Sequence, residues 1–202
     1  MTIADGIDAD FPTGLSVALL GRNGAGKSSL LKMIAGTVMP DRGRIERRGS
    51  VSWPVGFAGS FHGDLTGAEN ARFVARIYGI DTDGLVDFVD GFADLGRQLH
   101  SPFRTYSSGM RARLGFAISM GVPFDTYLVD EVTAVGDARF KERSETILND
   151  RLQSAGAIVV SHSLQLLDRI CDAGAVLENG RLTWHDDVKD AIAHHRENMG
   201  LT

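Results

Sequence analysis

Cysteine and long apolar runs are scarce in this chain. Among its 202 residues there is one cysteine, Cys171, so no disulfide can form within the chain. A single cysteine suits a reducing compartment. Cys171 lies on the apolar side of an expected helix, which favours a role in the core over a reactive one. No apolar run approaches the ~18–20 residues that a membrane-spanning helix needs, so a partner must supply any spanning part.

An excess of positive charge is also missing. The chain has 21 lysines and arginines against 26 aspartates and glutamates, which gives a formal net charge of −5. Domains that bind nucleic acid carry basic patches that attract phosphates, so we expect no nucleic-acid partner. The one short basic run falls in residues 42–48, where residues 44–48 read as a surface strand. We interpret it as the solvated face of a hairpin.

The most informative stretch is Gly21-Arg22-Asn23-Gly24-Ala25-Gly26-Lys27-Ser28. It fits the pattern G-x-x-x-x-G-K-[ST], a loop that binds nucleotide phosphates. Residues 15–20 read as a buried strand and residues 28–35 as a helix, so the loop delivers backbone N–H groups and a helix N-terminus to one anion. The expected nucleotide-binding residues are Gly21, Arg22, Asn23, Gly24, Ala25, Gly26, Lys27, Ser28 and Ser29.

Two side chains of this loop have particular chemistry. The ammonium of Lys27 can reach the β- and γ-phosphates as a point charge. The hydroxyl of Ser28 can ligate Mg²⁺, a hard cation that prefers oxygen donors. A loop of this kind does not by itself separate kinases, GTPases and transport motors.

Acidic and imidazole side chains follow two later strands. Asp130 and Glu131 end an apolar strand that begins at Thr126, and His162 follows the strand at residues 158–160. Open α/β sheets bind ligands at the carboxyl ends of their strands. We expect Asp130 to hold Mg²⁺, Glu131 to polarise the attacking water, and His162 to contact the γ-phosphate or that water. Taken singly, each could be a surface or structural residue.

Strands and helices alternate at both ends of the chain, whereas residues 61–120 read as nearly all helix. This order predicts an α/β fold: a P-loop NTPase core with a mostly parallel sheet, a small antiparallel β part and an inserted helical lobe. We expect one nucleotide-binding domain over residues 1–202, with its core in residues 1–60 and 121–202. Asn179-Gly180 predicts a hairpin turn in the antiparallel part.

Two local expectations concern aromatic residues. Thr66 to Glu69 form a capping box, which predicts a helix from there to about Tyr78. Phe73, Val74 and Ile77 share one face of this helix, and Gly79 is expected to end it. Phe11 is expected in a core strand rather than against an adenine ring.

These motifs together resemble the nucleotide-binding domain of ATP-binding cassette (ABC) proteins over nearly the whole chain. Tyr106-Ser-Ser-Gly-Met110 is similar to the family signature, a turn that opens a helix. Ser107 and Gly109 match its important positions, whereas Ser108 and Met110 depart from it. The resemblance implies hydrolysis of ATP with Mg²⁺ by two copies that sandwich two ATP molecules. Ser107 and Gly109 would contact the γ-phosphate bound to the other copy.

Three further positions are read through this resemblance. Asp137 is similar to the aspartate of the loop after the catalytic glutamate, although an N-cap for the following helix is an equally simple interpretation. His62 stands where the family has a glutamine that links Mg²⁺ to the membrane partner, which implies that His62 is a metal ligand. The family also begins with a strand and an aromatic residue that stacks on adenine, and we expect the chain to lack both.

A finer resemblance lies in Val51 to Gly79. With the signature turn, this stretch is similar to the bacterial capsular-polysaccharide exporters and their O-antigen and teichoic-acid relatives. It implies a peripheral ATPase on the cytoplasmic face of the plasma (inner) membrane, whose partners are a second copy and a separate transmembrane permease subunit. The alternatives are an ABC subunit for another substrate, a soluble P-loop kinase and a nucleotide-gated scaffold. A kinase does not explain Ser107, Gly109 or His162.

Overall fold

The computed structural model describes residues 2–56, 59, 61–130 and 137–200. The chain divides into two compact units. The first unit, here called the sheet unit, comprises Met1–Pro54, Phe124–Val132 and Asn149–Thr202. The second, here called the helical unit, comprises Val55–Pro123 and Thr133–Leu148.

The sheet unit contains six strands in the order β2-β3-β4-β1-β5-β6. All neighbouring pairs are parallel except β5 and β6, which form an antiparallel hairpin. The predicted mostly parallel sheet with a small antiparallel part is therefore confirmed. The elements are β1 (Ser16–Leu20), α1 (Lys27–Ile34), β2 (Val51–Pro54), β3 (Thr126–Asp130), β4 (Gly156–Val160), α6 (Leu164–Ile170), β5 (Ala173–Glu178), β6 (Arg181–His185) and α7 (Val188–Asn198).

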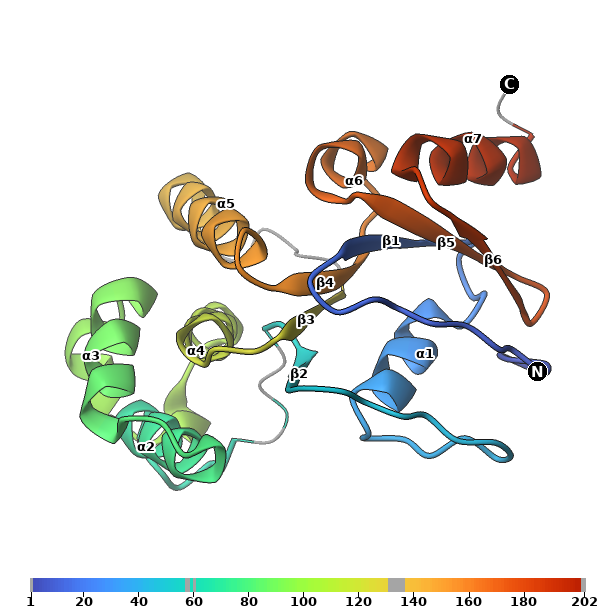
Figure 1. Ribbon diagram of the computed structural model, residues 1–202. Helices are drawn as coiled ribbons and strands as arrows, with labels where there is room; N and C mark the ends of the chain where they lie inside the picture. The colour runs from blue at the N-terminus through green and yellow to red at the C-terminus, as the bar shows by residue number, and fades with distance from the viewer. Residues whose placement is uncertain (1, 57–58, 60, 131–136, 201–202) are drawn as a thin grey trace. The chain divides into compact units, whose positions relative to one another are not determined.

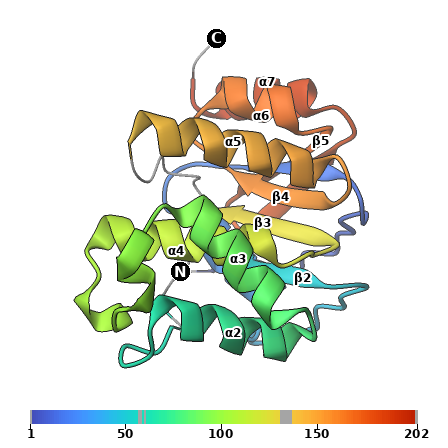
Figure 2. The ribbon, with the colours of Figure 1, turned by 90° about the vertical axis from the view of Figure 1, so that its left-hand side faces the viewer.

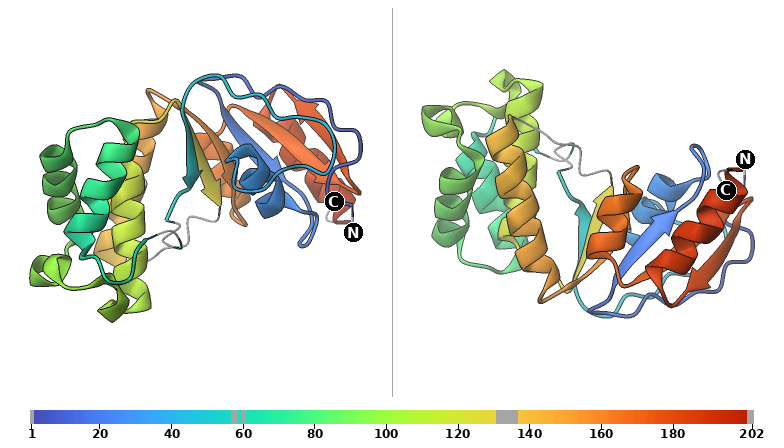
Figure 3. Two further views of the ribbon diagram at one scale, coloured as in Figure 1. Left: turned by 90° about the horizontal axis from the view of Figure 1, so that it is seen from below. Right: turned by 90° about the horizontal axis from the view of Figure 1, so that it is seen from above.

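Helices cover both faces of this sheet. Helix α1 lies on one face, and α6 and α7 lie on the other (Figure 1). Helix α7 runs along the strands at the β5 and β6 end (Figure 3, right). The hairpin turns at Asn179 and Gly180, both of which have positive φ, as a type I′ turn requires.

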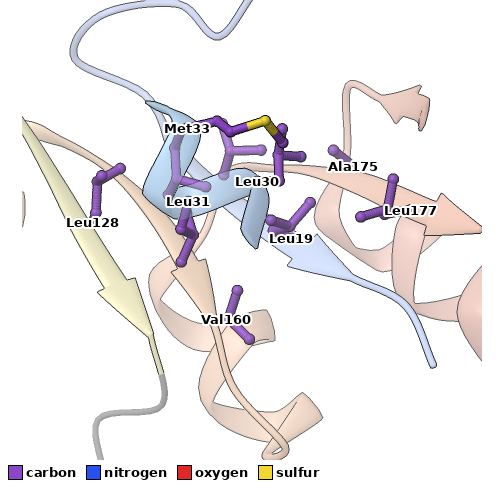
Figure 4. Close-up of a cluster of buried hydrophobic side chains, with 10 residues drawn as sticks. Leu19, Leu30, Leu31, Met33, Leu128, Val160, Ala175 and Leu177 are labelled. Carbon is purple, nitrogen blue, oxygen red and sulfur yellow. The ribbon is translucent and has the colours of Figure 1, made fainter. Parts of the chain in front are cut away.

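The core of the sheet unit forms between α1 and the parallel strands. Leu30, Leu31 and Met33 of α1 face Leu19 of β1 and Leu128 of β3 (Figure 4). Leu19, Leu31 and Leu128 are almost fully buried. Burying a leucine side chain stabilises a fold by roughly 1.5–3 kcal/mol. This packing fixes α1, and with it the loop between β1 and α1.

The helical unit is built from α2 (Gly67–Tyr78), α3 (Thr82–Ala93), α4 (Ser108–Gly121) and the first part of α5 (Ala138–Leu152), with short 3-10 turns at Gly96–His100 and Phe103–Thr105. Helix α3 lies beside both α2 and α4 (Figure 2). Phe140 of α5 packs edge-on against Phe92 and Phe116, with ring centroids 5.4 and 6.2 Å apart. This aromatic cluster explains why the start of α5 belongs to the helical unit. Among the described helices, none has both the length and the apolar character of a membrane span.

The strand expected at residues 44–48 and at Phe11 is absent, but Phe11 does pack against the core, as predicted. The guanidinium of Arg47 donates to the backbone oxygens of Met33 and Ile34 and so satisfies the last carbonyls of α1. Residues 44–48 therefore follow the end of α1 instead of pairing with another strand. Phe11 is half-buried, and its ring meets that of Trp184 edge-on at 5.8 Å.

Helix α2 begins and ends as predicted, and two of the three apolar residues that share one of its faces are exposed. Thr66 and Glu69 form the capping box, and Gly79 closes the helix in the left-handed conformation. Phe73 is 54% exposed and Ile77 is 62% exposed. Alanines take their place in the interior, because small side chains let α2 approach α3 closely. The buried residues of α2 are Gly67, Ala68, Asn70, Ala71, Val74 and Ala75.

Candidate nucleotide-binding site

Three strands of the sheet unit end at one edge, and each is followed by a predicted site residue or loop. Strand β4 lies between β3 and β1, parallel to both. Asp130 pairs with Val160, and Ala18 pairs with Val159. Counting along this register places Gly21 level with His162. Because neighbouring strands are about 4.8 Å apart, the phosphate loop, Asp130 and His162 start from adjacent positions on the sheet edge.

The loop between β1 and α1 turns tightly through three glycines with positive φ. Gly21, Gly24 and Gly26 have φ values of 151°, 82° and 103°. The N–H of Ala25 donates to the Arg22 oxygen at 3.0 Å, which closes a tight turn. Gly26 is the N-cap of α1 and has no side chain to bond the first turn. The first N–H groups of α1 are therefore left for an external anion.

Gly21→Ala is expected to destabilise the sheet unit and to weaken nucleotide binding. A Cβ at Gly21 would lie 2.3 Å from the Leu177 backbone oxygen on β5, and backbone cannot yield as a side chain can. We expect a loss of about 2–5 kcal/mol in the free energy of unfolding, from backbone strain and overpacking together.

Gly24→Ala is the matched control for this prediction. Its φ is 82°, but a Cβ there meets nothing within 4 Å, so only the strain of about 1–2 kcal/mol applies. Urea unfolding of both variants measures the difference. Equal losses would show that the contact with Leu177 does not decide the conformation at Gly21.

Two side chains brace the loop from within the sheet unit. The Lys27 ammonium donates to the Gly21 oxygen at 2.7 Å and to the Arg22 oxygen at 3.1 Å. The Arg22 guanidinium donates to the backbone oxygen of Asn198 at 2.7 Å, and Asn198 is the last residue of α7. Burial lowers the pKa of His195 on α7, and the nearby charge of Lys27 lowers it further. The end of α7 therefore lies beside the loop, with the imidazole of His195 near the ammonium of Lys27.

Asp130 and His162 are placed where the sequence predicted, at the ends of β3 and β4. Asp130 is half-buried and His162 is exposed. Glu131, the predicted water-polarising residue, lies outside the described residues. In the parts of the chain that the structure describes, no group of three or more His, Cys, Asp or Glu side chains could hold a metal ion. The oxygen donors Ser28 and Asp130 fit Mg²⁺ if phosphate and water oxygens complete its coordination.

The signature turn belongs to the helical unit and opens α4 as expected. Ser107 is the N-cap of α4, and its hydroxyl accepts from the Met110 N–H at 3.2 Å. A Cβ at Gly109 would meet nothing within 4 Å, so the first turn is open at this position. Arg111 donates to the Tyr106 oxygen at 3.1 Å and to the Arg104 oxygen at 3.0 Å. The backbone that leads into Ser107 is thereby held to the helix that follows.

His62 also lies in the helical unit, and its loop is held by a residue that the sequence analysis missed. Asn70, only 1% exposed, accepts from the His62 N–H at 2.9 Å and donates to the His62 oxygen at 3.2 Å. The His62 Nδ1 accepts from the Asp64 N–H at 3.3 Å. A metal could therefore use only Nε2. The sequence did contain a signal for this role. Asn70 is a polar residue on the face of the predicted helix that carries Ala71 and Val74, and a polar side chain on such a face needs a hydrogen-bond partner.

Asp137 caps α5, in agreement with one of its two interpretations. Its Oδ1 accepts from the Phe140 N–H at 2.9 Å, and its Oδ2 accepts from Arg113 at 2.9 Å. The hydrogen bond from Phe140 is the main cause that lowers the pKa of this carboxyl, and Arg113 adds to it. Asp137 is therefore charged at neutral pH. Its other interpretation, as part of the loop after Glu131, stays a prediction.

The sheet order, the loop and the strand-end residues define a P-loop nucleotide-binding domain. The family described as ABC transporter matches residues 4–134. The Escherichia coli protein named polysialic acid transport ATP-binding protein KpsT is 47% identical over 94% of this chain and 86% of its own. The Haemophilus influenzae protein named ATP-binding protein BexA is 43% identical over 97% and 90%. The chain therefore belongs to the ABC transporter family, as an ATP-binding domain.

Solved structures agree on the fold. The ATP-binding subunit of an ABC transporter superposes with a TM-score of 0.76 at 23% identity, over 98% of this chain and 88% of that one. A dimeric ATP-binding cassette in a post-hydrolysis state, bound to ADP and phosphate, gives 0.73 at 17% identity, over 92% and 90%. The predicted α/β fold class is thereby confirmed.

Proposed function

We propose that this chain is the ATP-hydrolysing motor subunit of an ABC exporter for a cell-surface polysaccharide. The observation that carries the proposal is the strand register of the sheet unit, in which the phosphate loop, Asp130 and His162 start from adjacent positions. The substrate class rests on the relatives. Besides the two already named, a Neisseria meningitidis protein named capsule polysaccharide export ATP-binding protein CtrD is 43% identical over 96% of this chain and 90% of its own.

The residues act on ATP by holding its phosphates and positioning one water. The N–H groups of the loop and of the first turn of α1 bind the phosphates. On binding, the Lys27 ammonium would leave the oxygens of Gly21 and Arg22 and turn to the β- and γ-phosphates. Glu131 accepts the proton of the attacking water, and His162 donates to the γ-phosphate. Mg²⁺, held by Ser28 and Asp130, would neutralise charge on the phosphate oxygens.

The partners of the motor follow from its family. A second copy would supply Ser107 and Gly109 to the nucleotide, as the signature turn does in ABC proteins. A separate transmembrane subunit would carry the polysaccharide, with this chain bound peripherally on the cytoplasmic side of the inner membrane. His62, at the loop before α2, would link the metal to that subunit.

Release of phosphate from ATP without an acceptor tests the enzymatic part of this proposal. A kinase would need an acceptor for turnover, and a scaffold would bind ATP without cleaving it. The purified chain is expected to release phosphate, and Lys27→Ala to release none. Surface polysaccharide in cells that depend on this chain tests the transport part. Its persistence in cells that carry only Glu131→Gln would contradict the proposal.

The exposed face of α2 is expected to dock the membrane subunit. Phe73 and Ile77 are four residues apart on α2 and exposed, and Asn70 of the same helix holds the loop of His62. Because burial raises the pKa of the native Cys171 thiol to about 12, a cysteine introduced at Ile77 would be the only readily reactive one. Cross-linking of Ile77→Cys to the membrane subunit is expected, and Trp184→Cys is the comparison. Cross-links only from residue 184 would contradict this placement.

A further inference from the structure

The loop between α1 and β2 carries the short basic run of the sequence, which the proposed function does not use. Residues 37–48, here called the basic loop, contain four arginines against one aspartate and one glutamate. The whole chain has a formal net charge of −5. All four arginines are exposed, and the basic loop leaves the end of α1 and returns to β2 within the sheet unit (Figure 1). The basic loop is therefore a positively charged surface on an otherwise acidic protein.

Contacts with α1 and with the core hold the basic loop in a defined conformation. The N–H and the hydroxyl of Thr37 both donate to the Lys32 oxygen at 3.0 Å. Near the other end of the loop, the Arg47 guanidinium donates to the Met33 oxygen at 2.7 Å. Ile45 packs against the core between these contacts. Arg47 and Ile45 thus fix the loop, and the other three arginines are presented to solvent.

These three arginines are available to an external anionic partner. Arg42 and Arg48 form no salt bridge with any residue in the described part of the chain. Arg44 pairs with Glu46 at 2.7 Å, but the two side chains are 84% and 64% exposed. Water screens an ion pair of this kind, so the pair holds the guanidinium of Arg44 only weakly. The three positive charges can therefore turn to a negatively charged surface outside the protein.

Two exposed apolar residues precede these arginines in the basic loop. Val38 is 45% exposed and Met39 is 82% exposed, the largest exposed fraction among the large apolar side chains of the described residues. An anionic lipid surface attracts arginine through its headgroups, and its acyl boundary accepts apolar side chains. A nucleic-acid backbone offers phosphates without an apolar layer, and so would leave Met39 in water. The combination of charge and apolar surface favours a lipid partner.

We infer that the basic loop binds directly to the surface of an anionic bilayer, with its three available arginines at the lipid headgroups and Met39 in the apolar boundary. The choice of a bilayer rests on the proposed function, in which this chain works at the inner membrane. Binding through so few side chains is weak by itself. It adds to the attachment through the transmembrane subunit, because two linked contacts reinforce each other.

Sedimentation of the purified chain with lipid vesicles tests the inference without any membrane protein. We expect the chain to sediment with vesicles of phosphatidylglycerol and phosphatidylcholine in equal parts, and to stay in the supernatant with phosphatidylcholine alone. Binding should weaken as salt is added, because salt screens exposed charges.

Two sets of substitutions separate the charged contribution from the apolar one. Arg42→Ser combined with Arg48→Ser should weaken binding about 25-fold at low salt, since each arginine near an anionic surface contributes about fivefold. This loss should shrink at high salt. Met39→Ser should weaken binding about tenfold at every salt concentration, because it removes apolar burial rather than charge.

Two controls carry the same chemical changes at other exposed positions of the sheet unit. Arg181→Ser combined with Lys189→Ser removes two positive charges, and Met199→Ser removes an exposed methionine. Both controls should bind anionic vesicles nearly as tightly as wild type. All the substituted side chains are exposed, so every variant is expected to fold, and melting curves check this.

A wild-type chain that does not sediment with anionic vesicles at low salt would overturn the inference and leave a protein as the partner of the basic loop. Equal losses in the loop variants and their controls would also overturn it, since net charge alone would then explain binding. Release of phosphate from ATP in solution is a separate measurement. Its absence would refute the proposed function, whereas vesicle binding alone decides the inference.

Discussion

Glu131→Gln is expected to leave ATP binding intact and to slow hydrolysis by about 10²–10⁴-fold, the usual contribution of a general base. Glu131 directly follows Asp130, the last residue of β3, at the edge where the phosphate loop lies. Glutamine has nearly the same size but cannot take a proton from water. The substitution therefore slows the chemical step without disturbing the loop or Lys27. The contacts that bind the phosphates of ATP are unchanged.

Two measurements on Glu131→Gln separate binding from chemistry. Titration with a fluorescent ATP analogue should give a wild-type Kd, while phosphate release falls. Lys27→Ala is the contrast. It removes the loop's cation and two hydrogen bonds within the loop, and we expect its affinity for ATP to fall at least about a hundredfold. Unchanged turnover in Glu131→Gln would remove Glu131 from the mechanism.

ATP is expected to convert Glu131→Gln from monomer to dimer, whereas ADP is not. Ser107 and Gly109 belong to the helical unit, and the phosphate loop, Asp130 and His162 belong to the sheet unit. A second copy would supply the signature turn, whose helix N-terminus accepts the charge of the γ-phosphate. ADP lacks that phosphate. Light scattering with ATP, with ADP and without nucleotide measures the effect.

Ser107→Arg tests whether the signature turn makes this dimer. The substitution removes the hydroxyl that caps α4 and places a bulky cation at the turn. We expect it to abolish the ATP-dependent dimer. Asp81→Arg is a suitable control, because Asp81 caps α3 in the same unit by accepting from Gly84 at 3.1 Å, so a cap is lost in both variants. A dimer that forms without nucleotide and survives Ser107→Arg would refute the sandwich.

Local chemistry in the sequence determined much of the site. Residues 15–20, the glycine-rich loop and residues 28–35 predicted a strand, a loop and a helix, and the structure contains β1, the loop and α1 in that order. The capping box at Thr66 and the turn at Asn179-Gly180 are confirmed for the same reason. Each of these features needs only residues close together in the chain, so the pattern of residue types is enough to predict it.

Packing between segments that are far apart in the chain decided the features that the sequence did not predict. Phe73 and Ile77 are exposed because alanines fill the buried face of α2. Which face of α2 is buried depends on its packing against α3. Arg47 serves the end of α1 rather than a strand, and Asn70 holds the loop of His62. Arg113 and Asp137 are 24 residues apart, and a charged pair so separated has no periodic signal. Only the tertiary structure could show that these side chains meet.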